Sequence, residues 1–266
     1  MLCVIRTHSA SLIISFSPPL FLSQVIILEY FSNHNPPIPT NHLSTHITMA
    51  FNDMYTNFDD MPIEENLLRG TYAYGFEKPS DVQQRIIGPI IKGNDLNIRS
   101  YGGSGKTAAY CVGLLGRVDM DVDAIQGLIM CPTRELATSI HCMLSHLGEY
   151  ISTDENNYCL FVGGTAVRDS ISKLESGKCV IAVGTPGRLL DLANRGLMRL
   201  DGLKTVIYDE ADYINDKGFE DQIHELNNIT PDSAQVVILS PTAQGANALA
   251  NKIMRCPEEI IVKGRK

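Results

Sequence analysis

Short apolar runs alternate with helix-length stretches through most of this chain, and that alternation restricts the fold more than any other feature. Near-continuous apolar strands separated by helices are typical of a parallel sheet with helices on both faces. The expected strands are 96–99, 125–131, 158–162, 179–183, 205–208, 236–239 and 259–262, and the expected helices include 105–116, 134–149, 186–195 and 219–227. We therefore expect an α/β domain whose ligands bind beyond the carboxyl ends of the strands.

Charge and cysteine content exclude several classes of protein. The net charge of −8 excludes a globally basic nucleic-acid binder, although a local basic groove remains compatible with it. The seven cysteines are scattered without a CxxC pair, which favours buried free thiols in a reducing compartment over a disulfide framework or a zinc site. The nearest approach to a ligand cluster is His141, Cys142 and His146, which we interpret as ordinary residues of a helix.

Residues 1–48 differ from the rest of the chain, because they hold a single Arg and a single Glu. The uncharged run 7–28 is interrupted by Pro18-Pro19. A membrane span requires about 20 mostly apolar residues, and a signal peptide requires an uninterrupted apolar stretch. Neither fits well. We expect a leader that is disordered or a mispredicted extension, with Met49 as a plausible natural start.

A glycine-rich loop between an expected strand and an expected helix predicts a phosphate-binding site. Its glycines allow the backbone amides to point at phosphate oxygens at a helix N-terminus. Its lysine can bridge the outer phosphates, and the threonine that follows can bind Mg²⁺. The strict GxxxxGK[ST] pattern fails only at its first position. The loop consists of Ser100, Tyr101, Gly102, Gly103, Ser104, Gly105, Lys106 and Thr107.

Adjacent carboxylates, Asp209-Glu210-Ala211-Asp212, follow the apolar run 205–208. Carboxylates exposed where a buried strand ends can hold Mg²⁺ on a nucleotide and orient an attacking water. An isolated pair of this kind is more often a strand-end cap or an acidic turn. Together with the phosphate loop about a hundred residues earlier, it favours a nucleoside triphosphate site.

With both motifs placed, the chain resembles the DEAD-box RNA helicases, most closely the group of eukaryotic translation initiation factor 4A. The resemblance begins near Phe58 and covers the first of that family's two RecA-like domains. It implies a Q-motif region over 49–86 and a RecA-like ATP-binding domain over 87–266. The segment 75–84 resembles the Q motif, with Phe58 at the upstream aromatic position. By that similarity Gln83 reads the adenine edge and Phe76 stacks on its face, which implies ATP rather than GTP.

Three further segments, 132–137, 163–164 and 185–188, resemble the family's RNA-backbone motifs. Taken alone, each is an ordinary turn; their order and their strand-end positions favour the functional interpretation. Threonine hydroxyls can donate to phosphates, glycines allow close approach, and arginines supply charge or position neighbouring loops, without reading bases. The residues expected at RNA are Pro132, Thr133, Arg134, Gly163, Gly164, Thr185, Gly187 and Arg188.

The resemblance also implies roles at the nucleotide. Lys106 and Thr107 bind phosphates and Mg²⁺, Asp209 holds Mg²⁺ through its coordination shell, and Glu210 orients the water as general base. In addition, Asp212 is expected to hydrogen-bond the loop Ser240-Pro241-Thr242. The implied cofactors are ATP and Mg²⁺.

The chain departs from the family in three places. Tyr101 is bulkier than the usual glutamine, so we expect ATP binding to survive in weakened form. Pro241 replaces an alanine, which pushes Ser240 toward an extended conformation and puts unwinding in doubt. The sequence ends where the family's linker to a second domain begins. That domain supplies arginine fingers worth on the order of 10³–10⁵ in rate, so we expect poor ATP hydrolysis unless a partner completes the site.

The leading interpretation is therefore a cytoplasmic, RNA-associated, ATP-binding helicase-type domain that acts as an RNA-dependent ATPase. Expected partners are RNA, bound weakly, and translation-initiation scaffold proteins; no membrane is implied. One alternative is a catalytically silent module that competes with a full-length helicase for RNA or scaffold proteins. The other is a P-loop NTPase that is not a helicase and acts on another substrate.

Overall fold

The structure, a computed structural model, describes residues 2–6, 11–15, 55–216, 218–254 and 257–263. These fall into a small N-terminal unit and a large body. In the first, β1 (Leu2–Arg6) and β2 (Ser11–Ser15) pair as an antiparallel hairpin that the sequence did not predict. The rest of the leader and Met49 lie outside the described residues, and the disorder of that part stays a prediction.

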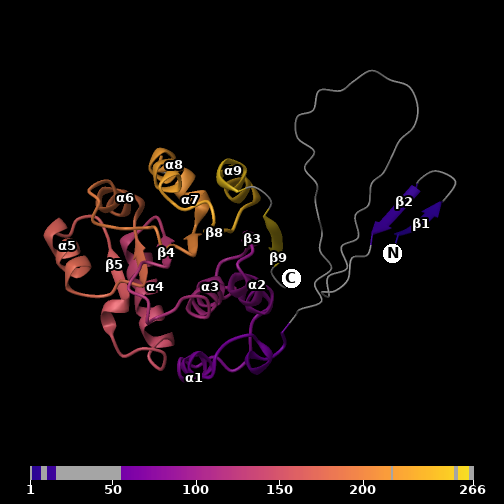
Figure 1. Ribbon diagram of the computed structural model, residues 1–266, viewed down its shortest axis with the longest axis horizontal. Helices are drawn as coiled ribbons and strands as arrows, with labels where there is room; N and C mark the ends of the chain where they lie inside the picture. The colour runs from indigo at the N-terminus through magenta and orange to yellow at the C-terminus, as the bar shows by residue number, and fades with distance from the viewer. Residues whose placement is uncertain (1, 7–10, 16–54, 217, 255–256, 264–266) are drawn as a thin grey trace, which may run out of the picture. The chain divides into compact units, whose positions relative to one another are not determined.

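The body is built on a seven-stranded sheet with the order β5-β6-β4-β7-β8-β3-β9, in which all neighbours pair in parallel (Figure 1). All the expected strands are confirmed, with bounds that shift by one or two residues, and so is the α/β fold class. The strands are β3 (Leu96–Ser100), β4 (Gly127–Met130), β5 (Tyr158–Phe161), β6 (Ile181–Gly184), β7 (Thr205–Tyr208), β8 (Gln235–Ser240) and β9 (Glu258–Val262).

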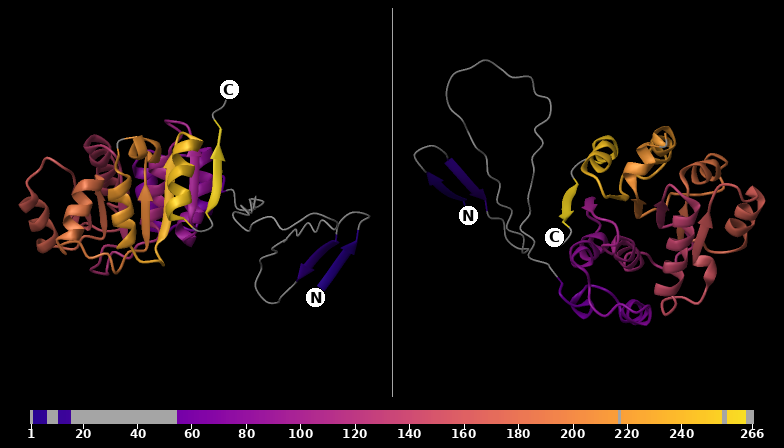
Figure 2. Two further views of the ribbon diagram at one scale, coloured as in Figure 1. Left: turned by 90° about the horizontal axis from the view of Figure 1, so that it is seen from above. Right: turned by 180° about the vertical axis from the view of Figure 1, so that it is seen from behind.

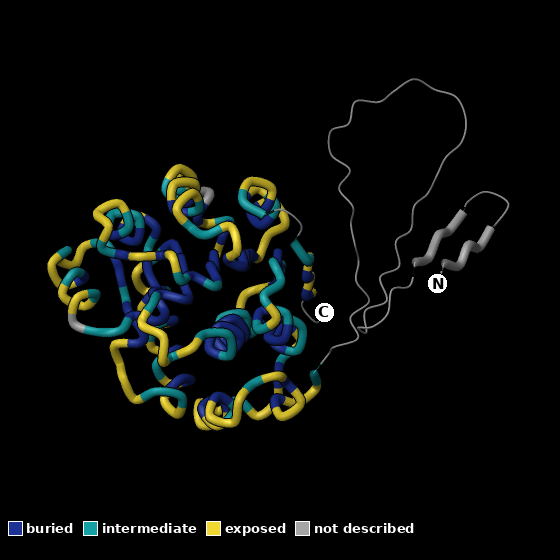
Figure 3. Tube along the Cα trace, in the orientation of Figure 1, coloured by how far each residue is buried: buried dark blue, intermediate teal, exposed yellow. Residues whose placement is uncertain are grey.

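Helices cover both faces of this sheet (Figure 2, right). Alternating strand residues divide between two apolar cores: Ile129 packs with α1 to α4, whereas Leu128 and Met130 pack with α5 to α9. The strands between these layers are largely buried, except that the edge strand β9 exposes Glu259 and Ile261, and most other exposed positions lie on the outer sides of the helices (Figure 3). The helices are α1 (Glu65–Ala73), α2 (Asp81–Lys92), α3 (Lys106–Leu115), α4 (Arg134–Leu147), α5 (Val167–Ser176), α6 (Pro186–Asn194), α7 (Ala211–Asp216), α8 (Glu220–Asn228) and α9 (Ala243–Ile253).

The strand order sorts the sequence motifs into two groups. Because neighbouring strands are parallel, their carboxyl ends lie at one edge of the sheet. The phosphate loop, the acidic turn and the loop 240–242 follow β3, β7 and β8, which are consecutive in the sheet. The three expected RNA motifs follow β4, β5 and β6, which are consecutive as well. One half of the edge therefore carries the nucleotide motifs, and the other half carries the RNA motifs.

Candidate functional site

The phosphate loop between β3 and α3 is compact and closed by its own lysine. Gly103 and Gly105 have φ angles of 75° and 95°, in the left-handed region that favours glycine. The Nζ of Lys106 donates to the backbone carbonyls of Ser100 and Tyr101, at 2.8 Å each. A bound phosphate group would replace these carbonyls as partners of the lysine. The Tyr101 side chain is 45% exposed, so its bulk faces solvent rather than the loop interior.

The acidic turn after β7 is held by hydrogen bonds to Asp209. This carboxylate is 4% exposed, and it accepts from the Tyr110 hydroxyl at 2.8 Å and from the Glu210 amide at 2.9 Å. Glu210 has a φ angle of 52°, and no other non-glycine residue in the described ranges has a positive φ. Backbone strain of this kind persists only where the surroundings impose it, and it is concentrated at functional sites.

The phosphate loop and the acidic turn share one electrostatic environment. Burial lowers the pKa of Lys106, and the carboxylates of Asp209, Glu210 and Asp212 counteract that shift. Burial raises the pKa of Asp209, against its hydrogen bonds from Tyr110 and Glu210. Burial is also the main cause that raises the pKa of Glu210, and repulsion by the carboxylates of Asp209 and Asp212 raises it further. Lys106 and the three carboxylates therefore form one cluster of interacting charges.

The oxygen donors of this cluster fit Mg²⁺ carried by a nucleotide. Within the described ranges, no three His, Cys, Asp or Glu residues gather into a metal site. Magnesium keeps several waters and binds through one or two carboxylates together with substrate phosphates. The Asp209 carboxylate and the hydroxyl of Thr107, the second residue of α3, are hard oxygen donors of the kind such an ion takes.

The Q-motif segment is bonded directly to the phosphate loop. Ser80 and Gln83 form a capping box at the start of α2, with the Ser80 amide donating to Gln83 Oε1 at 2.7 Å. The Ser80 hydroxyl donates to the Ser104 carbonyl at 2.9 Å. A Cβ atom added at Gly105 would lie 3.1 Å from Gln83 Nε2. The buried amide of Gln83 therefore faces the loop that is expected to hold the phosphates.

Aromatic rings gather around Phe76, the expected adenine platform. Tyr74 stacks on it with ring centroids 5.1 Å apart, and Phe58 lies behind it at 6.4 Å. Phe58 is only 1% exposed. We expected Phe58 among the nucleotide-binding residues; its burial instead places it in the core, where it supports Phe76.

The loop after β8 meets the acidic turn by packing. Ser240 ends β8 in an extended conformation, as expected before Pro241, and Thr242 caps α9. Asp212 lies against the first turn of α9, where a Cβ atom at Gly245 would come within 2.3 Å of the Asp212 Cβ. Its Oδ1 atom is buried without a hydrogen-bond partner. The expected hydrogen bond from Asp212 to the loop stays a prediction.

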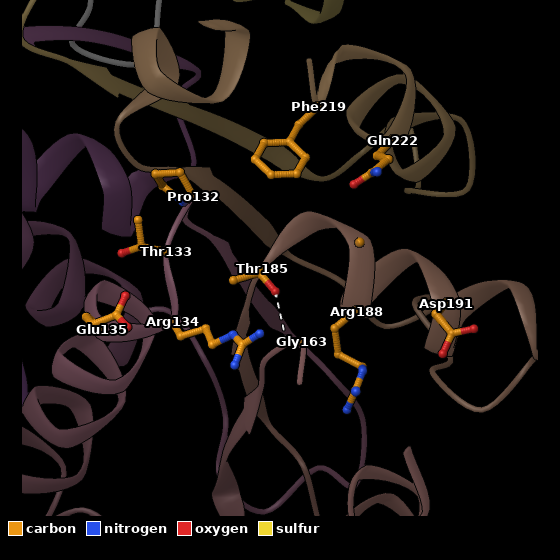
Figure 4. Close-up of a pocket in the computed structure, with 11 residues that line it drawn as sticks. Pro132, Thr133, Arg134, Glu135, Gly163, Thr185, Arg188, Asp191, Phe219 and Gln222 are labelled. Atoms are coloured by element: carbon orange, nitrogen blue, oxygen red, sulfur yellow. Dashed lines mark hydrogen bonds between the residues drawn. The ribbon is translucent and has the colours of Figure 1, made fainter. Parts of the chain in front are cut away.

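A hollow of about 670 Å³ lies beside these loops, at the ends of β4, β5 and β6 (Figure 4). All the expected RNA-contact residues except Gly164 line it. Gly164 is adjacent, since a Cβ atom there would lie 2.3 Å from the Arg134 guanidinium. The lining residues are Pro132, Thr133, Arg134, Glu135, Gly163, Thr185, Gly187, Arg188, Asp191, Phe219 and Gln222.

Two helices begin at this hollow, and each is preceded by a threonine whose hydroxyl remains able to donate. Thr133 Oγ1 accepts from the Leu136 amide at 3.2 Å, and Thr185 Oγ1 accepts from the Gly163 amide at 3.3 Å. Each hydroxyl proton is left available for an anion at a helix N-terminus, where the peptide dipoles add partial positive charge.

The two arginines of the hollow differ. Arg134 is exposed, so its charge is accessible. Arg188 is 8% exposed, and it donates to Thr165 Oγ1, the Thr165 carbonyl and Ser170 Oγ, at 3.1, 2.7 and 2.8 Å. Of the two roles expected for arginines here, Arg188 therefore fits the positioning of a neighbouring loop.

Comparison with known proteins identifies the family. The sequence matches the DEAD/DEAH box helicase family over residues 80–250. The chain belongs to this family. It is 44% identical over 209 residues to "Probable eukaryotic initiation factor 4A" of Trypanosoma brucei brucei, covering 78% of this chain and 52% of that protein. It is 45% identical over 208 residues to "ATP-dependent RNA helicase eIF4A" of Mycosarcoma maydis, covering 78% and 50%.

Solved DEAD-box structures share the fold. A DEAD box protein from Methanococcus jannaschii superposes with a TM-score of 0.70 at 31% identity, covering 79% of this chain and 56% of that one. Saccharomyces cerevisiae Dbp5 bound to RNA and ADP BeF3 gives 0.69 at 29% identity, covering 79% and 52%. This DEAD-box chain thus spans about half the length of the curated relatives it matches. Membership of the DEAD/DEAH box helicase family argues against the alternative of a P-loop NTPase unrelated to helicases.

Several lining residues of this DEAD-box domain were missed from the sequence. Phe219 and Gln222 enter the hollow from α8, and Asp191 enters it from α6 (Figure 4). Nothing in their local sequence pattern marks them. Phe219 and Gln222 reach the hollow because α8 packs against α6, a contact between distant segments of the chain.

Other sequence expectations concerned cysteines and membranes. The five cysteines with described side chains are free, and all except Cys142 are buried, as expected. His141 and His146 each contact a backbone carbonyl, which agrees with an ordinary helical role. In the part of the chain that the structure describes, no helix has both the length and the apolar content that crossing a bilayer requires.

Proposed function

We propose that this domain binds ATP with Mg²⁺ and RNA at neighbouring sites, and couples ATP hydrolysis to RNA binding as an RNA-dependent ATPase of the helicase type. The observation that carries the proposal is the division of one sheet edge into two halves. The strand ends of β3, β8 and β7 bring Lys106 to the carboxylates around Glu210, and those of β4, β6 and β5 build the hollow next to them.

At the nucleotide, each residue of the proposed site has one task. Loop amides and Lys106 hold the outer phosphates, while Phe76 and Gln83 hold adenine. Bound Mg²⁺ would neutralise phosphate charge, with Asp209 and Thr107 as the residues that hold it. The pKa of Glu210 is raised by partial desolvation of its carboxylate and by its acidic neighbours, and this residue orients the attacking water and accepts its proton.

At RNA, the hollow offers contacts to the backbone rather than to bases. Two helix N-termini, two threonine hydroxyls and the Arg134 guanidinium can bind phosphates. Asp191 and Glu135 line the same hollow, so the site is only locally basic within a domain of net negative charge. RNA binding is therefore expected to be weak, independent of sequence and sensitive to salt.

The names of the relatives, and the ligands in one of their structures, support this proposal. A structure of Dbp5 contains RNA and ADP BeF3, and relatives from several organisms are named ATP-dependent RNA helicases. By the same similarity we propose a cytoplasmic protein that contacts translation-initiation scaffold proteins.

Calorimetry and turnover assays test the proposal. Titration with ATP should release or absorb heat in the presence of Mg²⁺, and single-stranded RNA should raise the rate of ATP hydrolysis. Labelled RNAs of unrelated sequence should bind with similar affinities that fall steeply with salt. The absence of heat with Mg²⁺ and ATP would show that the proposal is wrong.

The silent interaction module remains the second candidate. Pro241 after the extended Ser240 favours it, because proline removes a backbone donor from the loop that meets the acidic turn. This candidate predicts RNA or protein binding without any turnover that RNA stimulates. RNA-stimulated hydrolysis that is lost in a Glu210→Gln variant would exclude it.

Replacing Gln83 by alanine is expected to abolish the preference for ATP over GTP. The variant loses the amide that would read the adenine edge, so ATP affinity should fall about tenfold toward that of GTP. Competition between ATP and GTP for a fluorescent nucleotide measures this. Gln84→Ala is the matched control, because it removes the same amide from the next residue, where Nε2 donates to the Pro79 carbonyl at 2.9 Å and has no expected contact with adenine. It should keep the preference for ATP. Equal ATP preference in wild type and Gln83→Ala would contradict the assignment.

Replacing Gly164 by alanine is expected to weaken RNA binding about tenfold. The slope of log affinity against log salt concentration should also become shallower by about one, the value expected for one lost phosphate contact. The new Cβ atom would lie 2.3 Å from the Arg134 guanidinium, so this flexible side chain must leave its place at the hollow. Anisotropy of labelled RNA at several salt concentrations measures both effects.

The control for Gly164→Ala is Gly196→Ala. Gly196 has a similar φ of 69°, but a Cβ atom there meets nothing within 4 Å. It reproduces the backbone strain without the collision, so it should bind RNA as wild type does. If both variants bind RNA equally, Arg134 is not an RNA contact.

A further inference from the structure

Tyr110 links the phosphate-loop helix to the acidic turn. It lies in α3, the helix that begins at Lys106, and its side chain is fully buried. Its hydroxyl donates to Asp209 Oδ2 at 2.8 Å. One helix therefore carries both the lysine of the phosphate loop and the hydroxyl that reaches the end of β7. None of the sequence motifs includes Tyr110.

The hydrogen bond continues through Asp209 to the next residue. Asp209 Oδ1 accepts from the Glu210 amide at 2.9 Å, so each carboxylate oxygen has one partner. Glu210 occupies the left-handed region at that point, with φ at 52°. Because a carboxylate offers about four lone-pair sites, both oxygens can still accept from waters around a metal ion. The Tyr110 hydroxyl thus fixes the rotation of the carboxylate without occupying it fully.

A neighbouring tyrosine shows that this contact is specific. Tyr208 directly precedes Asp209, and its side chain is also fully buried, but its hydroxyl has no hydrogen-bond partner. It packs in the core on the other face of the sheet from Tyr110. Of two buried tyrosines beside the acidic turn, only Tyr110 directs its hydroxyl at the carboxylate.

We propose that Tyr110 is a positioning residue for metal-dependent nucleotide binding, which fixes Asp209 and, through it, the backbone at Glu210. This inference rests on the proposed function. Tyr110 contacts neither nucleotide nor metal; it acts by holding Asp209 in the orientation from which the coordination shell of Mg²⁺ is bound. Its effect should therefore be confined to the part of nucleotide affinity that Mg²⁺ supplies.

Titration with a fluorescent ATP analogue, in Mg²⁺ and in EDTA, tests the proposal without requiring catalysis. Wild type should bind more tightly in Mg²⁺. Tyr110→Phe should bind the analogue in EDTA with the affinity of wild type. The factor by which Mg²⁺ raises that affinity should fall about tenfold, the size expected for the loss of a hydrogen bond to a charged group. Tyr208→Phe removes the same atom one residue from Asp209, and should behave as wild type.

A double-mutant cycle separates positioning from a general structural effect. If Tyr110 acts through Asp209, the Mg²⁺-dependent gain of Tyr110→Phe/Asp209→Asn should equal that of Asp209→Asn alone. Additive losses, an equal loss in EDTA, or a full gain in Tyr110→Phe would each overturn the inference while ATP binding by wild type stands. Wild type that binds no nucleotide would instead refute the proposed function, and the inference with it.

Discussion

Glu210→Gln is expected to leave ATP bound and to stop its hydrolysis. Glutamine keeps the size of the side chain and the strained turn, but it cannot accept a proton from the attacking water. General-base catalysis contributes about 10²–10⁴ in rate, so single-turnover hydrolysis at saturating RNA should fall by about that factor. The affinity for Mg²⁺ and ATP should change little, because Lys106 and the loop amides hold the phosphates.

The matched control for this variant is Glu225→Gln, an exposed glutamate of α8 that changes net charge equally. It should hydrolyse ATP as wild type does. Hydrolysis that persists in Glu210→Gln would assign the proton transfer to another group. Loss of ATP binding in that variant would mean that Glu210 holds the metal rather than the water.

Gly245→Ala is expected to destabilise the fold, although alanine is the better helix former. A Cβ atom there would lie 2.3 Å from the Cβ and 2.4 Å from the Cα of Asp212, so α9 must move away from the acidic turn. Overpacking of this kind costs about 1–3 kcal/mol. At about 2–4 °C per kcal/mol for a domain of this size, the melting temperature should drop by several degrees.

Gln244→Ala provides the comparison, because it changes an exposed position in the same helical turn. Its melting temperature should stay close to that of wild type. Alanine at position 245 raises helix propensity by about 1 kcal/mol over glycine, so an unchanged or higher melting temperature would show that α9 shifts freely.

Much of the fold could be predicted because its strands are short, apolar and regularly spaced. The runs around Leu128 and Ile207 are buried on both faces of the sheet. Such strands can be predicted from their own continuous apolar sequence, without knowing which strands they pair with. The strand order could not be predicted, since pairing depends on packing between distant segments. The helix that begins after Ser80 was likewise unassigned, although its capping box is visible in the sequence.

The candidate site, too, could be predicted only in part. Local patterns marked Lys106 and Glu210, because phosphate and metal chemistry restrict the residue types near each strand end. They could not show that Phe58 lies in the core or that the Arg188 guanidinium is bonded to Thr165 and Ser170. Nor could they show that the Tyr101 ring is exposed. Each depends on the direction of a side chain, which only three-dimensional packing determines.

The closed phosphate loop has a consequence for ligand choice. The Lys106 ammonium donates two of its three N–H groups to the backbone carbonyls of Ser100 and Tyr101. A ligand must therefore offer it enough anionic oxygen to compensate for those two bonds. Di- and triphosphates can do so, whereas a nucleoside monophosphate or free phosphate offers less, so these two bonds favour nucleotides with longer phosphate chains over abundant small anions.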